Sequence, residues 1–181
     1  VRLERLSITC PLTLAYNERY LTPRMLEEMD RARRFGSPLS AALIGLDDFE
    51  RVGEDWGSEI GDRVLRQFAD RARAVVRRAD ALVRREDDFV LIMPHTDATQ
   101  AMVVAERIRH SLCDRAIVLG TSQRIEQTVS LGVATWNECL SAKRLTQAAE
   151  LGLNRARALG GNRVVAIEPS ASRPPSAPPT A

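Results

Sequence analysis

The apolar positions of this chain follow two patterns, one with a helical period and one of short continuous runs. Apolar residues recur every three or four positions in four long segments, which predicts amphipathic helices. These helices are expected over residues 18–34, 58–78, 97–112 and 141–160, with a shorter one near residues 48–52. Short apolar runs at residues 39–46, 128–135 and 163–167 predict strands. Helices that alternate with strands in this order indicate an α/β sandwich with a mixed sheet.

Two of these segments carry a finer prediction. Residues 39–46 (LSAALIGL) are apolar almost throughout, which is typical of a strand buried on both faces at the centre of a sheet. The apolar side of the first helix is expected to be formed by Leu21, Met25, Leu26 and Met29.

Residues 80–94 predict a β-hairpin with a highly charged turn. Two apolar strand segments are joined there by five consecutive charged residues, Arg84 to Asp88. Tight turns favour Gly, Asn or Asp, because a positive φ costs those residues little. Arg85-Glu86 is therefore an unfavourable pair for the turn itself.

Composition limits the classes of protein to which the chain can belong. With 181 residues, of which 44% are apolar, the chain can bury one substantial core and is expected to form a single domain. A net charge of +2 gives no strong field, so neither nucleic acid nor an anionic membrane is an expected partner. No apolar run approaches the ~20 residues of a membrane span. Cys10, Cys113 and Cys139 are widely spaced, which supports neither a disulfide framework nor a zinc site and favours a reducing cytoplasm.

The two ends of the chain differ from the middle. Residues 1–8 place Leu3 and Leu6 at helical spacing and are expected to be the end of an upstream signalling helix. Residues 169–181 consist mostly of Pro, Ser and Ala and are expected to be a disordered tail or linker. The folded domain is therefore expected over residues 9–168.

Several separate segments resemble, in the same order, the motifs of the GGDEF family, the diguanylate cyclase domain. The segments are Cys10–Arg19 (CPLTLAYNER), Gly45–Glu54 (GLDDFERVGE) with Gly61-Asp62, the hairpin, Thr128–Ala134 (TVSLGVA) and Gly160-Gly161-Asn162. The signature hairpin is degenerate, because the two glycines that give the family its name are absent. The resemblance implies a palm-like fold, in which helices flank a central mixed sheet that includes the signature hairpin.

The resemblance also implies a metal-dependent reaction. In the family, two facing domains each hold a GTP, and carboxylates hold the metal ions that help each 3′-hydroxyl attack the partner's α-phosphate to form cyclic di-GMP. One metal ligand of the family falls on Gly45, which offers none. The other falls on Asp87, a remnant ligand with Asp88 beside it.

The nucleotide contacts implied by the resemblance are only partly kept. The Asn that reads guanine falls on Gly53, whereas the base-contacting Asp is kept as Asp62. Of two late cations that hold phosphates, one is kept as Arg157 and the other is lost at Gly161. These losses predict that the domain makes no cyclic di-GMP, binds no catalytic metal and needs no cofactor, with Mg²⁺ required only if GTP binds.

The hairpin admits two alignments. The spacing from Asp80 to Phe89 is one residue shorter than in the family, and the place of the deletion stays open. If Arg84 takes the place of the family's arginine before the turn, the turn itself is shortened. Both alignments remove the pair of glycines.

Arg77-Arg78-Ala79-Asp80 matches the Arg-x-x-Asp pattern of the family's product-binding inhibitory site. A guanidinium fork suits guanine and phosphate, and a carboxylate accepts hydrogen bonds from the guanine edge. The alternative is that the pattern has no function. Arg-x-x-Asp arises easily by chance in an Arg-rich chain, and a helix C-terminus attracts cations in any case. For the hairpin acids the corresponding alternative is a solvated loop, and for Asp48 it is an N-cap.

Three classes of function follow. The preferred one is a catalytically inactive regulatory or protein-interaction module within a larger cytoplasmic signalling protein, partnered by another protein or by a second copy. The second is a binding module for cyclic di-GMP through Arg77 and Asp80, or for GTP without turnover. The third is an active cyclase that recruits a replacement carboxylate.

Overall fold

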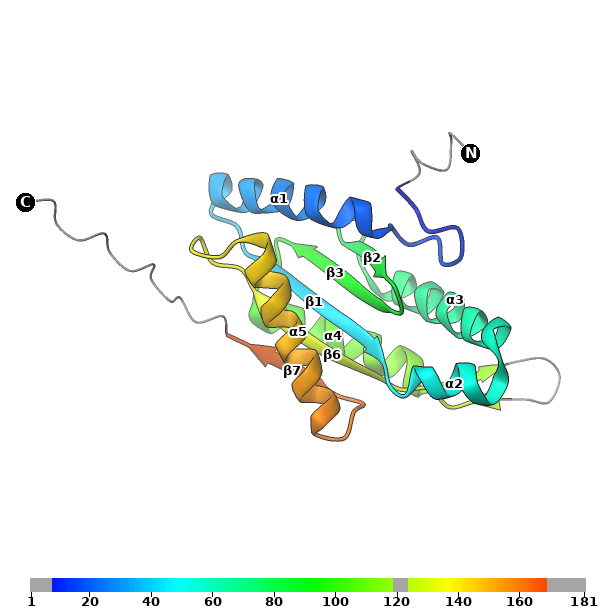
Figure 1. Ribbon diagram of the computed structural model, residues 1–181. Coiled ribbons are helices and arrows are strands. Elements are labelled where there is room, and N and C mark those ends of the chain that lie inside the picture. The colour runs from blue at the N-terminus through cyan, green and yellow to red at the C-terminus, as the bar shows by residue number, and fades with distance from the viewer. Residues whose placement is uncertain (1–7, 119–123, 169–181) are drawn as a thin grey trace, which may run out of the picture.

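A five-stranded mixed sheet lies between two layers of helices in the computed structural model, which describes residues 8–118 and 124–168 (Figure 1). The strand order is β2-β3-β1-β6-β7, in which β6 and β7 are parallel and the other neighbours are antiparallel. The strands are β1 (Leu39–Leu46), β2 (Ala81–Arg85), β3 (Asp88–Pro94), β6 (Val129–Thr135) and β7 (Val164–Ile167). The predicted α/β fold with its hairpin is confirmed. The predictions for residues 1–7 and 169–181 lie outside the described residues.

Among the described residues, five helices accompany the sheet, and their limits are close to the predicted ones. They are α1 (Glu18–Phe35), α2 (Phe49–Trp56), α3 (Ser58–Val75), α4 (Ala98–Cys113) and α5 (Ala142–Ala158). Helix α3 ends at Val75, three residues before its predicted end at Arg78. Arg77 and Arg78 therefore lie in the loop that enters β2. A second sheet of β4 (Ile117–Val118) and β5 (Arg124–Ile125) was not predicted, because two residues are too short to show a period. Within the described ranges no helix combines the length and the apolar character that crossing a bilayer requires.

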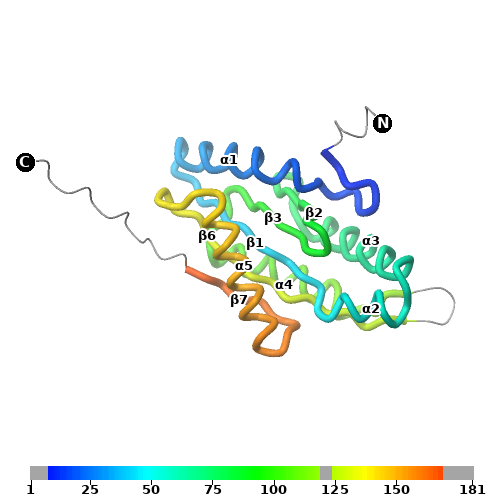
Figure 2. Tube along the Cα trace, in the orientation of Figure 1, coloured from blue at the N-terminus to red at the C-terminus, as the bar shows by residue number. Residues whose placement is uncertain are grey.

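The alternation of side chains along β1 divides the core into two halves. Ala42 and Ile44 face α3 and α4, whereas Ala41 and Leu43 face α1 and α5. Figure 2 shows the same division, with α1 and α5 on the near side of the sheet. The strand is buried at every position, as expected for the central strand of a covered sheet.

The buried face of α1 differs from the predicted one at two positions. Leu26 was expected to face the core but is 51% exposed, and Glu28 is only 3% exposed. The buried stripe is Met25, Glu28, Met29 and Ala32, which follows the i, i+3, i+4, i+7 pattern. The prediction was wrong because it gave hydrophobicity more weight than helical phase.

Two glycines bring α5 against the sheet at close range. A Cβ on Gly132 in β6 would overlap the backbone of α5 at Ala149 O and Leu153 N. A Cβ on Gly152 in α5 would lie 2.8 Å from the Cα of Gly132 and 2.8 Å from the carbonyl oxygen of Val165. Neither contact can be relieved by a side-chain rotation, because the opposing atoms belong to the backbone. The position of α5 over the sheet therefore depends on both glycines.

We expect Gly132→Ala to lower the free energy of unfolding by roughly 1–3 kcal/mol or more, because it overpacks backbone against backbone. The matched control is Gly53→Ala in α2, where an added Cβ meets nothing within 4 Å. That substitution should instead stabilise the protein by up to about 1 kcal/mol through helix propensity. Urea denaturation followed by circular dichroism measures both. Equal stability of Gly132→Ala and the wild type would contradict the close approach.

Candidate functional site

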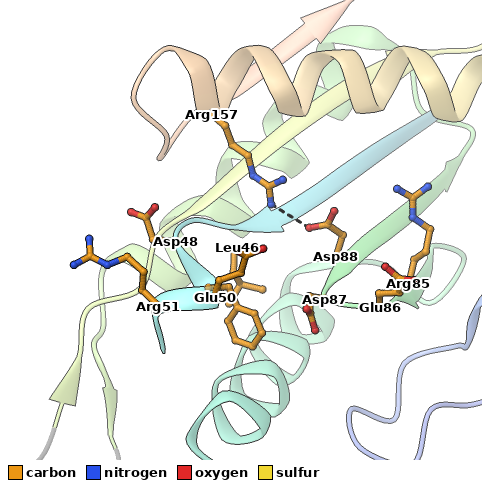
Figure 3. Close-up of a pocket in the computed structure, with 10 residues that line it drawn as sticks. Leu46, Asp48, Glu50, Arg51, Arg85, Glu86, Asp87, Asp88 and Arg157 are labelled. Carbon is orange, nitrogen blue, oxygen red and sulfur yellow. Dashed lines mark hydrogen bonds and ion pairs between the residues drawn. The ribbon is translucent and has the colours of Figure 1, made fainter. Parts of the chain in front are cut away.

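A cleft of about 430 Å³ opens where β1 ends, between the hairpin and the C-terminal part of α5 (Figure 3). It is lined by Leu46, Asp48, Phe49, Glu50, Arg51, Arg85, Glu86, Asp87, Asp88 and Arg157. Among the candidate residues singled out from the sequence, the lining includes Asp48, Asp87, Asp88 and Arg157.

Arg157 lies over the position at which the family has its first metal ligand. Gly45 and Asp88 are direct cross-strand partners in β1 and β3, and Arg157 Nη2 donates to Asp88 Oδ1 at 3.1 Å. A Cβ on Gly45 would overlap Nη2 of Arg157 and would lie 2.8 Å from Asp88 Oδ1. The guanidinium thus occupies the space in which a side chain at position 45 would begin. A cation is already present beside the carboxylate.

Burial and Arg157 act on the pKa of Asp88 in opposite directions. Burial raises the pKa of the Asp88 carboxyl above its ordinary value, and the charge and hydrogen bond of Arg157 oppose that rise. Within the described residues, no group of three or more His, Cys, Asp or Glu side chains is placed to hold a metal ion. Of the two ligand positions that the family motifs imply, Gly45 offers no side-chain ligand and Asp87 is exposed.

Asp47 is fully engaged in structural hydrogen bonds. Its carboxylate accepts from Thr128 Oγ1 at 2.7 Å, from Ser130 Oγ at 2.7 Å and from the backbone N–H of Asn162 at 2.9 Å. These bonds join β1 to β6 and to the loop between α5 and β7. Gly161 lies in that loop with a φ of 71°, and its Cβ position is 3.1 Å from an Asp47 oxygen. The cation predicted to be lost at Gly161 is therefore absent from a turn that favours glycine.

Of the other residues singled out from the sequence, Asp48 lines the same cleft, whereas Asp62 and Gly53 do not. Asp48 is the N-cap residue of α2 with a φ of 52°, but its side chain makes no capping hydrogen bond. Asp62 lies in the first turns of α3 and does not line the cleft. Gly53 lies in α2, where a Cβ would meet nothing, so packing does not explain a glycine there.

The hairpin turn consists of Glu86 and Asp87, and not of Arg85 and Glu86 as expected. Arg85 is the last residue of β2 and is the cross-strand partner of Asp88 in β3. Its Nη2 lies 3.6 Å from Oε1 of Glu150 in α5. Glu86 takes a φ of 54°, which is costly for a side chain of its type. Glu86 and Asp87 are exposed, and Figure 3 shows Asp87 directed away from Arg157. The acid that faces the site is Asp88.

Arg84 ties this turn to the opening segment of the domain, a contact that sequence spacing did not reveal. Its Nε donates to the carbonyl oxygen of Glu86 at 2.7 Å, and its Nη1 donates to Sγ of Cys10 at 3.4 Å. Burial tends to raise the pKa of the Cys10 thiol, but hydrogen bonds from Thr13 and Arg84 outweigh it and lower the pKa to about 7. Cys10 occupies the place of the Asp that opens the family motif, so a thiol stands where the family has a carboxylate.

A second cavity, of about 370 Å³, lies beside Arg77 and Asp80. The backbone N–H of Arg77 donates to Asp80 Oδ2 at 2.8 Å, and the N–H of Asp80 donates to the carbonyl oxygen of Arg77 at 3.0 Å. Burial raises the pKa of Asp80, and the hydrogen bond and charge of Arg77 oppose the rise. The two predicted residues are thus brought together by one turn.

The opening motif closes this second cavity, which the sequence did not predict. Leu14, at a φ of 56°, and Tyr16 line it together with Arg73 and Arg78. Tyr16 is held beside β2, because its N–H donates to Leu82 O and its carbonyl oxygen accepts from the N–H of Arg84. Three arginines and one carboxylate therefore surround a partly apolar cavity.

Comparisons with known proteins agree in fold and family. A family model described as diguanylate cyclase, GGDEF domain, matches residues 8–163. The response regulator PleD of Caulobacter vibrioides is 38% identical over 163 residues, which cover 88% of this chain and 36% of PleD. The chain spans about a third of the length of the curated relatives it matches.

Two solved structures are similar over most of the chain. The GGDEF domain of DgcB from Caulobacter crescentus, in complex with c-di-GMP, has a TM-score of 0.84 at 25% identity, covering 88% of this chain and 92% of that one. Diguanylate cyclase SiaD from Pseudomonas aeruginosa, in complex with its activator SiaC, has a TM-score of 0.83 at 30% identity, covering 92% of this chain and 64% of that one.

The lowered pKa of Cys10 predicts a distinctive pH profile for its alkylation. In a Cys113→Ser/Cys139→Ser background, the rate of reaction with iodoacetamide should rise with a midpoint near pH 7. Arg84→Met should move this midpoint upward, because the thiolate loses its cationic partner. Since the folded pKa is the lower one, thiolate formation stabilises the fold at alkaline pH, and this contribution is lost as the pH falls through about 7. A midpoint in the ordinary thiol range for both proteins would contradict the Cys10–Arg84 contact.

Proposed function

The chain belongs to the GGDEF family of diguanylate cyclase domains, and from this membership we propose that it is a non-catalytic, regulatory domain of cyclic di-GMP signalling. The observation that carries the proposal is the position of Arg157 over Gly45, paired with Asp88. Catalysis in the family rests on carboxylates that hold metal ions against the phosphates. Here the first ligand position, Gly45, offers no carboxylate, and the second, Asp87, is directed away from Arg157. Asp88, the acid that faces the site, already has a protein cation beside it.

The ion pair also removes Arg157 from the role that the family motif gives it. With Nη2 of Arg157 donating to Asp88 at 3.1 Å, a phosphate must either share the remaining N–H groups beside a carboxylate or draw the guanidinium away from Asp88. Asp88 would then be left half-buried without its cation, which is unfavourable because burial penalises the charged form. Both the metal and the phosphate contacts of a cyclase are therefore weakened by one interaction.

The cavity at Arg77 and Asp80 supports a second proposal, that the domain binds cyclic di-GMP there. Three arginines and an oriented carboxylate offer donors for phosphate and acceptors for the guanine edge. The similar DgcB domain was solved in complex with c-di-GMP. In this reading the domain reports on the product of other cyclases. The similar cyclase SiaD was solved with its activator protein, which supports a protein partner for the regulatory role.

We expect no cyclic di-GMP to form when the purified protein is incubated with GTP and Mg²⁺ or Mn²⁺. Product is measured by liquid chromatography, with a diguanylate cyclase of known activity as the positive control. Circular dichroism of the same sample shows that the protein is folded. Formation of cyclic di-GMP above the level of a protein-free control would overturn the non-catalytic assignment.

Binding of cyclic di-GMP should depend on Arg77. Loss of a charge-assisted hydrogen bond predicts that Arg77→Met weakens binding roughly 10- to 100-fold by calorimetry. The matched control is Arg66→Met, which removes an exposed arginine that lies in α3, the helix that precedes the turn, and that does not line the cavity. No binding by the wild type, or equal binding by both variants, would exclude this site. A parallel titration with GTP and Mg²⁺ tests the alternative that the domain binds GTP without turnover.

A further inference from the structure

Arg24 of α1 reaches the turn that carries Arg77 and Asp80. Its Nη2 donates to the backbone carbonyl oxygen of Ala79 at 3.3 Å. The same nitrogen lies 2.8 Å from Oε1 of Glu28, one helical turn further along α1. A single guanidinium therefore bridges α1 and the candidate binding turn, 55 residues apart in sequence.

Burial of the Arg24–Glu28 ion pair carries a large desolvation free energy. Glu28 is 3% exposed and lies in the core-facing stripe between Met25 and Met29, and Nε of Arg24 is buried without a hydrogen-bond partner. Taking two charges out of water costs as much as or more than their attraction returns, and an apolar pair of similar size often does as well or better. Stability alone does not account for the pair.

The geometry gives the pair a different role. Glu28 holds the Arg24 guanidinium against α1, and the guanidinium in turn holds the carbonyl of Ala79. The turn is closed internally by the two Arg77–Asp80 hydrogen bonds, both of which lie within four residues. Arg24 adds a bond from another element, so the placement of the turn relative to the rest of the domain depends on α1.

We propose that Arg24 is a positioning residue that couples α1 to the Arg77–Asp80 turn, so that a displacement of α1 changes the affinity of the turn for cyclic di-GMP. The ligand in this statement rests on the proposed function, whereas the mechanical coupling does not. Coupling of binding free energies is reciprocal, so a ligand on the turn also stabilises the position of α1. The opening motif, which precedes α1 in the chain and lines the same cavity, is part of the same unit.

Amide hydrogen exchange without ligand tests the coupling alone. Arg24→Lys keeps a cation beside Glu28 but removes the guanidinium, whose Nη2 donates to the carbonyl oxygen of Ala79. We expect the amides of Arg77 and Asp80 to exchange roughly tenfold faster in this variant, as for the loss of one hydrogen bond. The matched control is Arg31→Lys, since Arg31 also lies near Glu28, at 3.5 Å, on the same helix. Its turn amides should exchange as in the wild type, and amides of β1 and β6 should be unchanged in both variants.

A second variant guards against a merely structural effect. Arg24→Met/Glu28→Met removes both charges together, so no buried charge is left unpaired. It should keep the stability of the domain and still accelerate exchange at Arg77 and Asp80. Unchanged exchange at these two amides in both Arg24 variants would overturn the proposal.

Titration with cyclic di-GMP tests the functional consequence. Arg24→Lys should bind the nucleotide about three- to tenfold more weakly than the wild type, whereas Arg31→Lys should bind equally well. If the wild type binds no cyclic di-GMP, the ligand assignment fails, and the exchange experiment still decides the coupling. Equal affinity of the wild type and Arg24→Lys, where the wild type binds, would overturn the effect of α1 on binding.

Discussion

The approach of α5 to β6 at Gly132 and Gly152 is the packing constraint on which the rest of the site depends. Because neither glycine carries a Cβ, helix and strand meet backbone to backbone, and no side-chain rotation can adjust the contact. Arg157 follows Gly152 by five residues on the same helix, so the depth and angle of α5 set where its guanidinium falls. A larger residue at either glycine would raise the helix and move Arg157 away from Asp88.

With α5 fixed, the strand-end site has an internal cation. Alternation along β1 and β3 directs Gly45 and Asp88 toward α5, and the absence of a side chain at Gly45 leaves space that the Arg157 guanidinium fills. A cation tethered to a helix differs from a metal ion in a way that matters for catalysis. It neutralises Asp88, but it has no open coordination positions with which to bind a phosphate and activate a hydroxyl. The loss at Gly45 and the retention of Arg157 are thus two parts of one arrangement.

Much of this could be predicted from sequence, and the failures have specific causes. The helices and strands followed from periodicity. The helix expected from residue 97 has Asp97 as the N-cap of α4, in a capping box with Gln100. The burial of Glu28 in place of Leu26 was missed, because its partner Arg24 lies one turn away and is not visible in a hydropathy pattern. The prediction placed the turn at Arg85-Glu86, one residue before its position at Glu86-Asp87. Neither Arg nor Glu favours a tight turn, so residue type did not indicate where β2 ends and β3 begins.

The contacts between distant segments were beyond the reach of the sequence. Gly45 was identified as a lost ligand, but nothing in the chain indicated that Arg157 fills its place. The contacts of Arg84 with Cys10 and of Arg24 with Ala79 join segments more than 50 residues apart, and each depends on the packing of the whole domain.

The central claim, that a protein cation takes the place of the metal at Asp88, is tested most directly by titrating the protein into Mn²⁺ and following free Mn²⁺ by electron paramagnetic resonance. The account predicts that the signal of free Mn²⁺ is not reduced by the wild-type protein. Stoichiometric binding of Mn²⁺ that Asp87→Asn or Asp88→Asn abolishes would contradict it.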